Sequence, residues 1–205
     1  MKSQVTTKRG DSGTTTNIAG ETLPKSHPIF ECCGQIDALR AQTALCRLEL
    51  LASGHPEAVR IAEFLRWLLH MYFAIGSQCN DPRNLRPEYR KIDVGPEHLA
   101  KLEAHQADFE ARVKLPRQFV LSAGTIASAH LDIACTTARA AERSVVRLKE
   151  AVPEFAADAL LAFMNRVSDS LFMLARWVDG GKSATVDYSV LGVIEGANSE
   201  RGTGA

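Results

Sequence analysis

The N-terminal segment of the chain brings together residue types that bind phosphate. Between Thr7 and Gly20 it contains glycines, threonines, Lys8 and Arg9, and Lys25 follows. Glycines let backbone amides turn toward an anion, hydroxyl groups add donors, and Lys or Arg supplies positive charge. The segment lacks the G-x-x-x-x-G-K-[ST] spacing of a Walker A loop. It therefore indicates either a phosphate-binding loop of another kind or a disordered polar N-terminus, and composition does not separate the two.

A second group of charged residues lies within an alanine-rich stretch. Arg139, Glu142 and Arg143 are spaced by three and four residues, so a helix places them on one face. Two guanidinium groups beside a carboxylate suit a polyphosphate, because Arg forms charge-assisted hydrogen bonds to phosphate oxygens. An isolated group of this kind is more often a solvated helix surface with an internal ion pair. Both interpretations stay open at this point.

A third group interrupts the apolar pattern near the end of the chain. Asn165, Ser168 and Asp169 compete with helical backbone bonding, so their presence inside a helix favours use of their side chains as hydrogen-bonding groups. The partner is either a ligand or a neighbouring helix.

His70 has no second ligand at metal-binding spacing, and adjacent Cys32 and Cys33 point to different sides of a helix, so we expect no metal held by protein side chains.

The composition is that of a one-domain globular protein. The 205 residues include 24 basic and 24 acidic side chains, and 45% are hydrophobic. The balanced charge predicts no affinity for nucleic acid, and no apolar run has the length of a membrane span. Five cysteines without a C-x-x-C pair indicate a reducing compartment. We expect a cytoplasmic protein; the Thr-rich basic N-terminus also suits a transit peptide, but Asp11 and Glu21 oppose that interpretation.

Apolar residues spaced by three and four, separated by Gly and Pro, predict an all-α fold with almost no strand. The predicted helices run from Pro28 to Leu51, Pro56 to Ser77, Glu97 to Val113, Thr125 to Glu150 and Glu154 to Val178. Residues 79–96 contain three prolines and are predicted as a loop. We divide the chain into a phosphate-binding loop (residues 1–27), a helical bundle (residues 28–180) and a flexible C-terminal tail (residues 181–205) rich in Gly, Ser and Thr.

The order of these groups resembles the PduO-type ATP:cob(I)alamin adenosyltransferases, of which the chain looks like a divergent member. The resemblance covers residues 7–176, most of the chain. It is carried by T-K-R-G-D-S-G-T-T from Thr7, Gly20-Glu21, Lys25, F-E-x-x-G-x-x-D ending at Asp37, Phe119-x-Leu121, R-A-A-E-R from Arg139, and N-R-V-S-D-S-L-F-M-L-A-R from Asn165. Each motif is weak by itself, but their joint order is specific.

The resemblance implies an antiparallel, ferritin-like five-helix bundle that forms a homotrimer and binds ATP between neighbouring subunits. It also implies the reaction, in which cobalt(I) of a reduced corrinoid attacks the 5′ carbon of ATP, with Mg²⁺ present, and inorganic triphosphate leaves. A reductase that supplies cobalt(I) and a B12-dependent acceptor enzyme are the implied partners. The implied ATP-binding residues are Thr7, Lys8, Arg9, Gly10, Thr15, Thr16, Lys25, Arg139, Glu142, Arg143 and Asn165.

Phe119 and Arg139 are the implied catalytic residues. Phe119 matches the aromatic residue of the family that approaches the lower face of the corrin and helps to remove the lower axial ligand of cobalt. The sequence departs from the family pattern nearby. Cys135 and Ala140 stand where relatives usually have Arg, and Asp132 stands where they usually have His. Asp37, the implied subunit-interface residue, has thereby lost its usual Arg partner across the subunit boundary.

These departures leave three functional hypotheses. The first is the transferase, with weaker or altered catalysis or a specialised substrate because two cations are missing. The second is an ATP- or corrinoid-binding protein of the same fold that has lost transfer activity and serves as a sensor, carrier or chaperone. The third, a purely structural helical bundle, is opposed by the joint order of the motifs.

Overall fold

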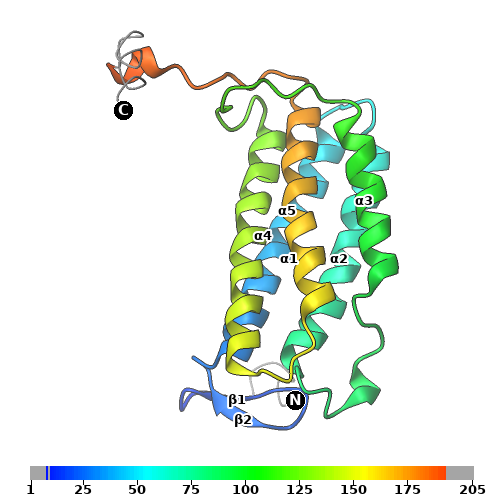
Figure 1. The fold of residues 1–205 in the computed structure, drawn as a ribbon, viewed down its shortest axis with the longest axis vertical. Coiled ribbons are helices and arrows are strands. Elements are labelled where there is room, and N and C mark those ends of the chain that lie inside the picture. Colours follow the sequence, from blue (N-terminus) through cyan, green and yellow to red (C-terminus); the bar gives the residue numbers. More distant parts are fainter. Residues whose placement is uncertain (1–7, 9, 193–205) are drawn as a thin grey trace, which may run out of the picture.

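The computed structural model describes residue 8 and residues 10–192. This part of the chain is mainly helical, with five α-helices and one two-stranded antiparallel sheet (Figure 1). The helices are α1 (Pro28–Ala52), α2 (Ala58–Asn80), α3 (Pro96–Glu110), α4 (Ile126–Ala151) and α5 (Asp158–Val178). The strands are β1 (Thr14–Thr16) and β2 (Thr22–Pro24), and the short 3₁₀ helices are η1 (Pro87–Tyr89) and η2 (Tyr188–Leu191).

The helices begin at residues suited to helix starts. In α1 the His27 ring accepts a hydrogen bond from the Ile29 amide, and Pro28 occupies the first turn, where a missing amide costs nothing. In α4 the hydroxyl of Thr125 accepts from the Ser128 amide while the Ser128 hydroxyl accepts from the Thr125 amide, forming a capping box. Local chemistry therefore sets where both helices start.

The apolar faces of the helices form one core. Helix α1 packs against α2 and α4, and α5 packs against α4 and α3, with the helix axes lying side by side (Figure 1). Every helix contributes fully or almost fully buried residues to the core, among them Ile36, Leu65, Leu102, Leu131 and Leu171. None of the described helices combines the length and the apolar character that a membrane crossing requires. The irregular segments lie at the two ends of the packed helices.

One end carries a hairpin that the sequence did not predict. Strands β1 and β2 pair with Thr15 opposite Leu23, next to the end where α1 begins and α2 ends (Figure 1). Three residues per strand are too few to show an alternating pattern, so the expectation of almost no strand missed this element.

The other end carries the described part of the C-terminal segment. We predicted residues 181–205 as a flexible tail, but residues 184–186 run antiparallel to the segment before α4. The Leu121 amide donates to the Ala184 carbonyl at 2.7 Å, and the Val186 amide donates to the Phe119 carbonyl at 2.8 Å. The first residues of the predicted tail are therefore tied to the segment that leads into α4.

Candidate functional site

The hairpin shapes the segment that the sequence predicts to bind phosphate. Gly13 adopts a φ of +84°, a conformation that favours glycine, and its carbonyl accepts the Lys25 amide at 2.9 Å. A Cβ on Gly10 would lie 3.0 Å from Lys25 Nζ, so the absence of a side chain lets the ammonium group lie against the loop. Lys8 is exposed. Lysine charge and loop backbone thus lie close together, as a phosphate site requires.

The predicted threonines contribute hydroxyl groups along the same hairpin. Thr15 is half-buried and Thr16 is exposed, and the Thr16 hydroxyl lies 3.1 Å from that of Thr22 on β2. Thr7 and Arg9, the other two residues predicted here, lie outside the described residues.

A polar network that the sequence did not single out anchors the hairpin to α2. Asn17 is 5% exposed, and its side chain both donates to Glu21 Oε2 and accepts the Glu21 amide, each at 2.8 Å. The Ile18 amide donates to Asn80 Oδ1 at 2.6 Å, and Arg83 Nη2 pairs with Glu21 Oε1 at 2.7 Å. The turn between the strands is therefore fixed by α2 and by the start of the following loop. Asn17 with Gly20 three residues later is a turn signal that could have indicated this arrangement.

The charged group on α4 meets the polar group on α5. Arg139 and Arg143 are exposed, Glu142 is half-buried, and Asn165 Nδ2 donates to Glu142 Oε1 at 3.4 Å. Neither guanidinium forms an ion pair with another described residue, so the internal ion pair expected from an ordinary solvated face is absent within the described chain. The two helices present two open cations beside an oriented carboxylate and amide.

Phe119 belongs to a separate region of the same molecule. Its side chain is 79% exposed, and its segment leads into α4 at the end opposite the hairpin (Figure 1). Within one chain, therefore, the structure brings Glu142 and Asn165 together and Gly10 and Lys25 together, but places the Phe119 segment and the hairpin apart.

Cys135, which departs from the family pattern, and Asp37, which lacks its usual Arg partner, both have local partners. Asp37 pairs with Arg40 at 2.9 Å within α1. Cys135 is 4% exposed, its thiol donates to the Ser168 carbonyl at 3.3 Å, and burial raises its pKa. Asp37 is thus supplied with a cation from its own helix, and Cys135 fills a place in the core between α4 and α5.

Cys33 and Cys46 do not provide a ready nucleophile. Burial raises the pKa of Cys33 to about 11 and that of Cys46 to about 12, which keeps both thiols protonated near neutral pH.

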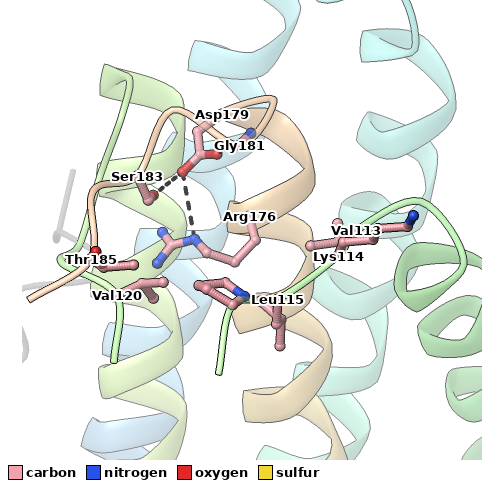
Figure 2. A pocket seen from close by; sticks show the side chains of 10 residues that line it. Val113, Lys114, Leu115, Val120, Arg176, Asp179, Gly181, Ser183 and Thr185 are labelled. Atoms are coloured by element: carbon pink, nitrogen blue, oxygen red, sulfur yellow. Dashed lines mark hydrogen bonds and ion pairs between the residues drawn. The ribbon is translucent and has the colours of Figure 1, made fainter. Parts of the chain in front are cut away.

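A buried ion network at the Phe119 end was also missed from the sequence. Arg176 on α5 is 4% exposed, and its Nη2 donates to Asp132 Oδ2 at 2.6 Å. Its Nε lies 3.6 Å from Asp179 Oδ2 (Figure 2). Arg176 also lines a cavity of about 410 Å³ between the segment after α3, the Phe119 segment and the C-terminal segment. An Arg at the end of an otherwise apolar helix face was the available signal, because a buried cation requires paired anions.

Comparison with known proteins assigns the family. The cobalamin adenosyltransferase family matches residues 5–178, which include the hairpin and all five helices. The chain belongs to this family. It is 34% identical over 174 residues to the corrinoid adenosyltransferase PduO of Citrobacter freundii, covering 84% of this chain and 49% of that protein. It is 30% identical over 175 residues to the human corrinoid adenosyltransferase MMAB, covering 85% of this chain and 68% of the human protein.

Solved structures agree on the fold. A variant of the PduO-type ATP:corrinoid adenosyltransferase from Lactobacillus reuteri, complexed with cobalamin and ATP, superposes with a TM-score of 0.77 at 23% identity and covers 88% of this chain and 97% of that chain. A second variant complexed with the same two ligands gives the same TM-score at 24% identity, covering 90% of this chain and 96% of the other. The chain spans about half the length of the bacterial PduO proteins that it matches, 49% in each case.

Proposed function

We propose that the chain transfers the 5′-deoxyadenosyl group of ATP to the cobalt(I) of a reduced corrinoid and releases triphosphate. The observation that carries this proposal is the family match over residues 5–178, which contains every group singled out for chemistry. The C. freundii and human relatives are named corrinoid adenosyltransferases, and the L. reuteri relative is complexed with cobalamin and ATP. The same reaction is therefore the function that best uses these residues.

The proposed reaction requires little acid or base catalysis by protein side chains. Cobalt(I) is a strong nucleophile, so the corrinoid supplies the bond-forming electrons, and the protein aligns the 5′ carbon and stabilises the leaving triphosphate. Lys8, Lys25, Arg139 and Arg143 supply cations for that purpose. Glu142 and Asn165 orient the nucleotide, and ATP brings Mg²⁺ on its phosphate oxygens, the kind of ligand that this ion prefers.

The proposal includes the implied assembly. We place the helices in an antiparallel five-helix bundle, and three copies in a homotrimer with the nucleotide between subunits. Exposed apolar side chains on adjacent helices support a subunit contact: Leu48 on α1 is 60% exposed, and Ile133 on α4 is 50% exposed. A cytoplasmic location, a reductase that supplies cobalt(I) and a B12-dependent acceptor enzyme complete the proposal.

Transfer is tested by incubating the protein with ATP, Mg²⁺ and chemically reduced cobalamin. Loss of the cobalt(I) absorption together with formation of triphosphate is the expected result. Arg139→Met is expected to lower the rate of transfer by at least about 10-fold, since it removes a cation that stabilises the leaving triphosphate. Arg66→Met is the matched control, because Arg66 is an exposed arginine on α2.

A second function is favoured by Cys135 and Ala140, which replace two cations of the family pattern. It is an ATP- or corrinoid-binding protein without transfer activity. Binding of ATP and cobalamin without triphosphate formation supports this alternative. Absence of both binding and turnover contradicts both functions.

A further inference from the structure

The buried network around Arg176 joins the ends of two helices. Arg176 lies near the end of α5, Asp132 lies on α4, and Asp179 directly follows α5. Both carboxylates face the same guanidinium, at 2.6 Å from Nη2 and 3.6 Å from Nε. Arg176 and Asp179 are 4% and 1% exposed, so water does not screen these interactions effectively. The network therefore holds these two helix ends at a defined separation.

Each carboxylate of the network also holds a segment of irregular backbone. Asp132 Oδ2 accepts a hydrogen bond from the Ala123 amide at 3.1 Å, and Asp179 Oδ1 accepts one from the Gly181 amide at 2.8 Å. The other oxygen of Asp179 accepts a hydrogen bond from the Ser183 hydroxyl (Figure 2). Ala123 has a φ of +66°, which residues with a side chain rarely adopt. Such a conformation persists where neighbouring contacts enforce it. The hydrogen bond from the Ala123 amide to Asp132 is such a contact, and Ala123 lies four residues after Phe119.

The two held segments lie directly against each other. The amides of Leu121 and Val186 make the two hydrogen bonds between them, and Val120 lies opposite Thr185. A Cβ on Gly124 would come within 2.7 Å of Lys182 Cβ and 3.2 Å of Asp179 Cβ. The segments therefore approach so closely at this position that only glycine fits.

Phe119 gains its position from this backbone. Its ring is 79% exposed, so packing within the described chain does little to orient it. Its own carbonyl is the acceptor for the Val186 amide. The backbone that carries the ring is thus held by the pairing of residues 119–121 with residues 184–186.

We propose that the C-terminal segment 181–186, anchored by Asp132, Arg176 and Asp179, is a positioning element that holds Phe119 against the corrinoid. This inference rests on the proposed function, since it assigns the segment a task in that reaction. The segment acts through Phe119 and does not touch the reacting atoms. Residues that the sequence indicates as a tail thereby support the corrinoid side of the site from outside it.

Val186→Pro tests the inference, because proline removes the amide that donates to Phe119. Val186→Ala is the matched control, since it trims the same side chain and keeps that amide. In the proline variant, but not in the Val186→Ala control, we expect faster hydrogen exchange of residues 117–123 and a loss of transfer of about 10- to 100-fold, as a misplacement of about 1 Å costs about that much. Gly124→Ala, which wedges the segments apart, is expected to reproduce both effects and covers the case in which the proline variant does not fold.

A double-mutant cycle separates positioning from a general structural role. If the segment acts through Phe119, then Phe119→Ala combined with Val186→Pro is no slower than Phe119→Ala alone, with an unchanged dissociation constant for ATP. Multiplicative losses, or equal transfer by the proline variant, the Gly124→Ala variant and wild type, overturn the inference. A wild-type chain that transfers nothing contradicts the proposed function itself, so the two failures are distinguishable.

Discussion

Replacing Asn80 by alanine is expected to weaken ATP binding without unfolding the protein. Asn80 Oδ1 accepts the Ile18 amide at 2.6 Å, and its Nδ2 donates to Cys33 Sγ at 3.3 Å, so one side chain ties the hairpin turn to α1 and α2. The substitution frees the turn but leaves the apolar core intact. The proposed phosphate-binding loop would then be held mainly by the half-exposed Arg83–Glu21 pair.

The magnitude follows from the bonds that are lost. A hydrogen bond of this kind contributes about 0.5–1.5 kcal/mol net. Alanine returns up to about 0.7 kcal/mol because it is a better helix former than Asn. Because two such bonds are lost, we expect the free energy of global unfolding to fall by about 0.3–3 kcal/mol, which is less than the roughly 5–15 kcal/mol that keeps a typical domain folded. If the released hairpin must be reordered on binding, the dissociation constant for ATP rises by about 2- to 12-fold.

Calorimetric titration of ATP with Mg²⁺, together with urea unfolding, measures both quantities. Ser77→Ala is the matched control, because Ser77 lies one turn earlier on α2 and its hydroxyl donates to the Phe73 carbonyl at 3.1 Å, away from the hairpin. The reasoning is wrong if Asn80→Ala binds ATP as tightly as Ser77→Ala does, or if it lowers only the free energy of unfolding.

Three further predictions concern the helices. Burial and the charge of Lys101 lower the pKa of His105, so the folded protein binds that proton less tightly than the unfolded chain does. The free energy of unfolding should therefore fall as the pH drops below about 6.5, the usual pKa of His. Urea unfolding at several pH values measures this fall, which should be smaller in the His105→Phe variant. Tyr72→Phe should change the free energy of unfolding by less than about 1 kcal/mol or raise it, because the buried hydroxyl has no hydrogen-bond partner within the described chain; a loss above about 2 kcal/mol in thermal unfolding would contradict this. Cys135→Arg should increase transfer while lowering the free energy of unfolding by about 1–3 kcal/mol, because the position is 4% exposed; equally high activity in both proteins would show that the missing cation does not limit catalysis.

The sequence by itself determined the helices. The first was predicted from Pro28 to Leu51 and is observed as Pro28–Ala52, and the last was predicted to end at Val178, where α5 ends. Apolar spacing, proline and capping residues act within a few residues of one another, so they can be read without knowing the fold. The order of the charged and polar groups also sufficed to indicate the family. The roles of the individual site residues remain predictions.

The tertiary structure alone decided which segments hold the site in place. The hairpin has only three residues per strand, and its turn is fixed by Asn80, 62 residues away from Ile18. Arg176 and Asp132 are separated by 44 residues, yet they form one buried pair that supports the Phe119 segment and the chain after α5. No local pattern encodes these contacts, because they exist only once the helices have packed and removed the charges from water.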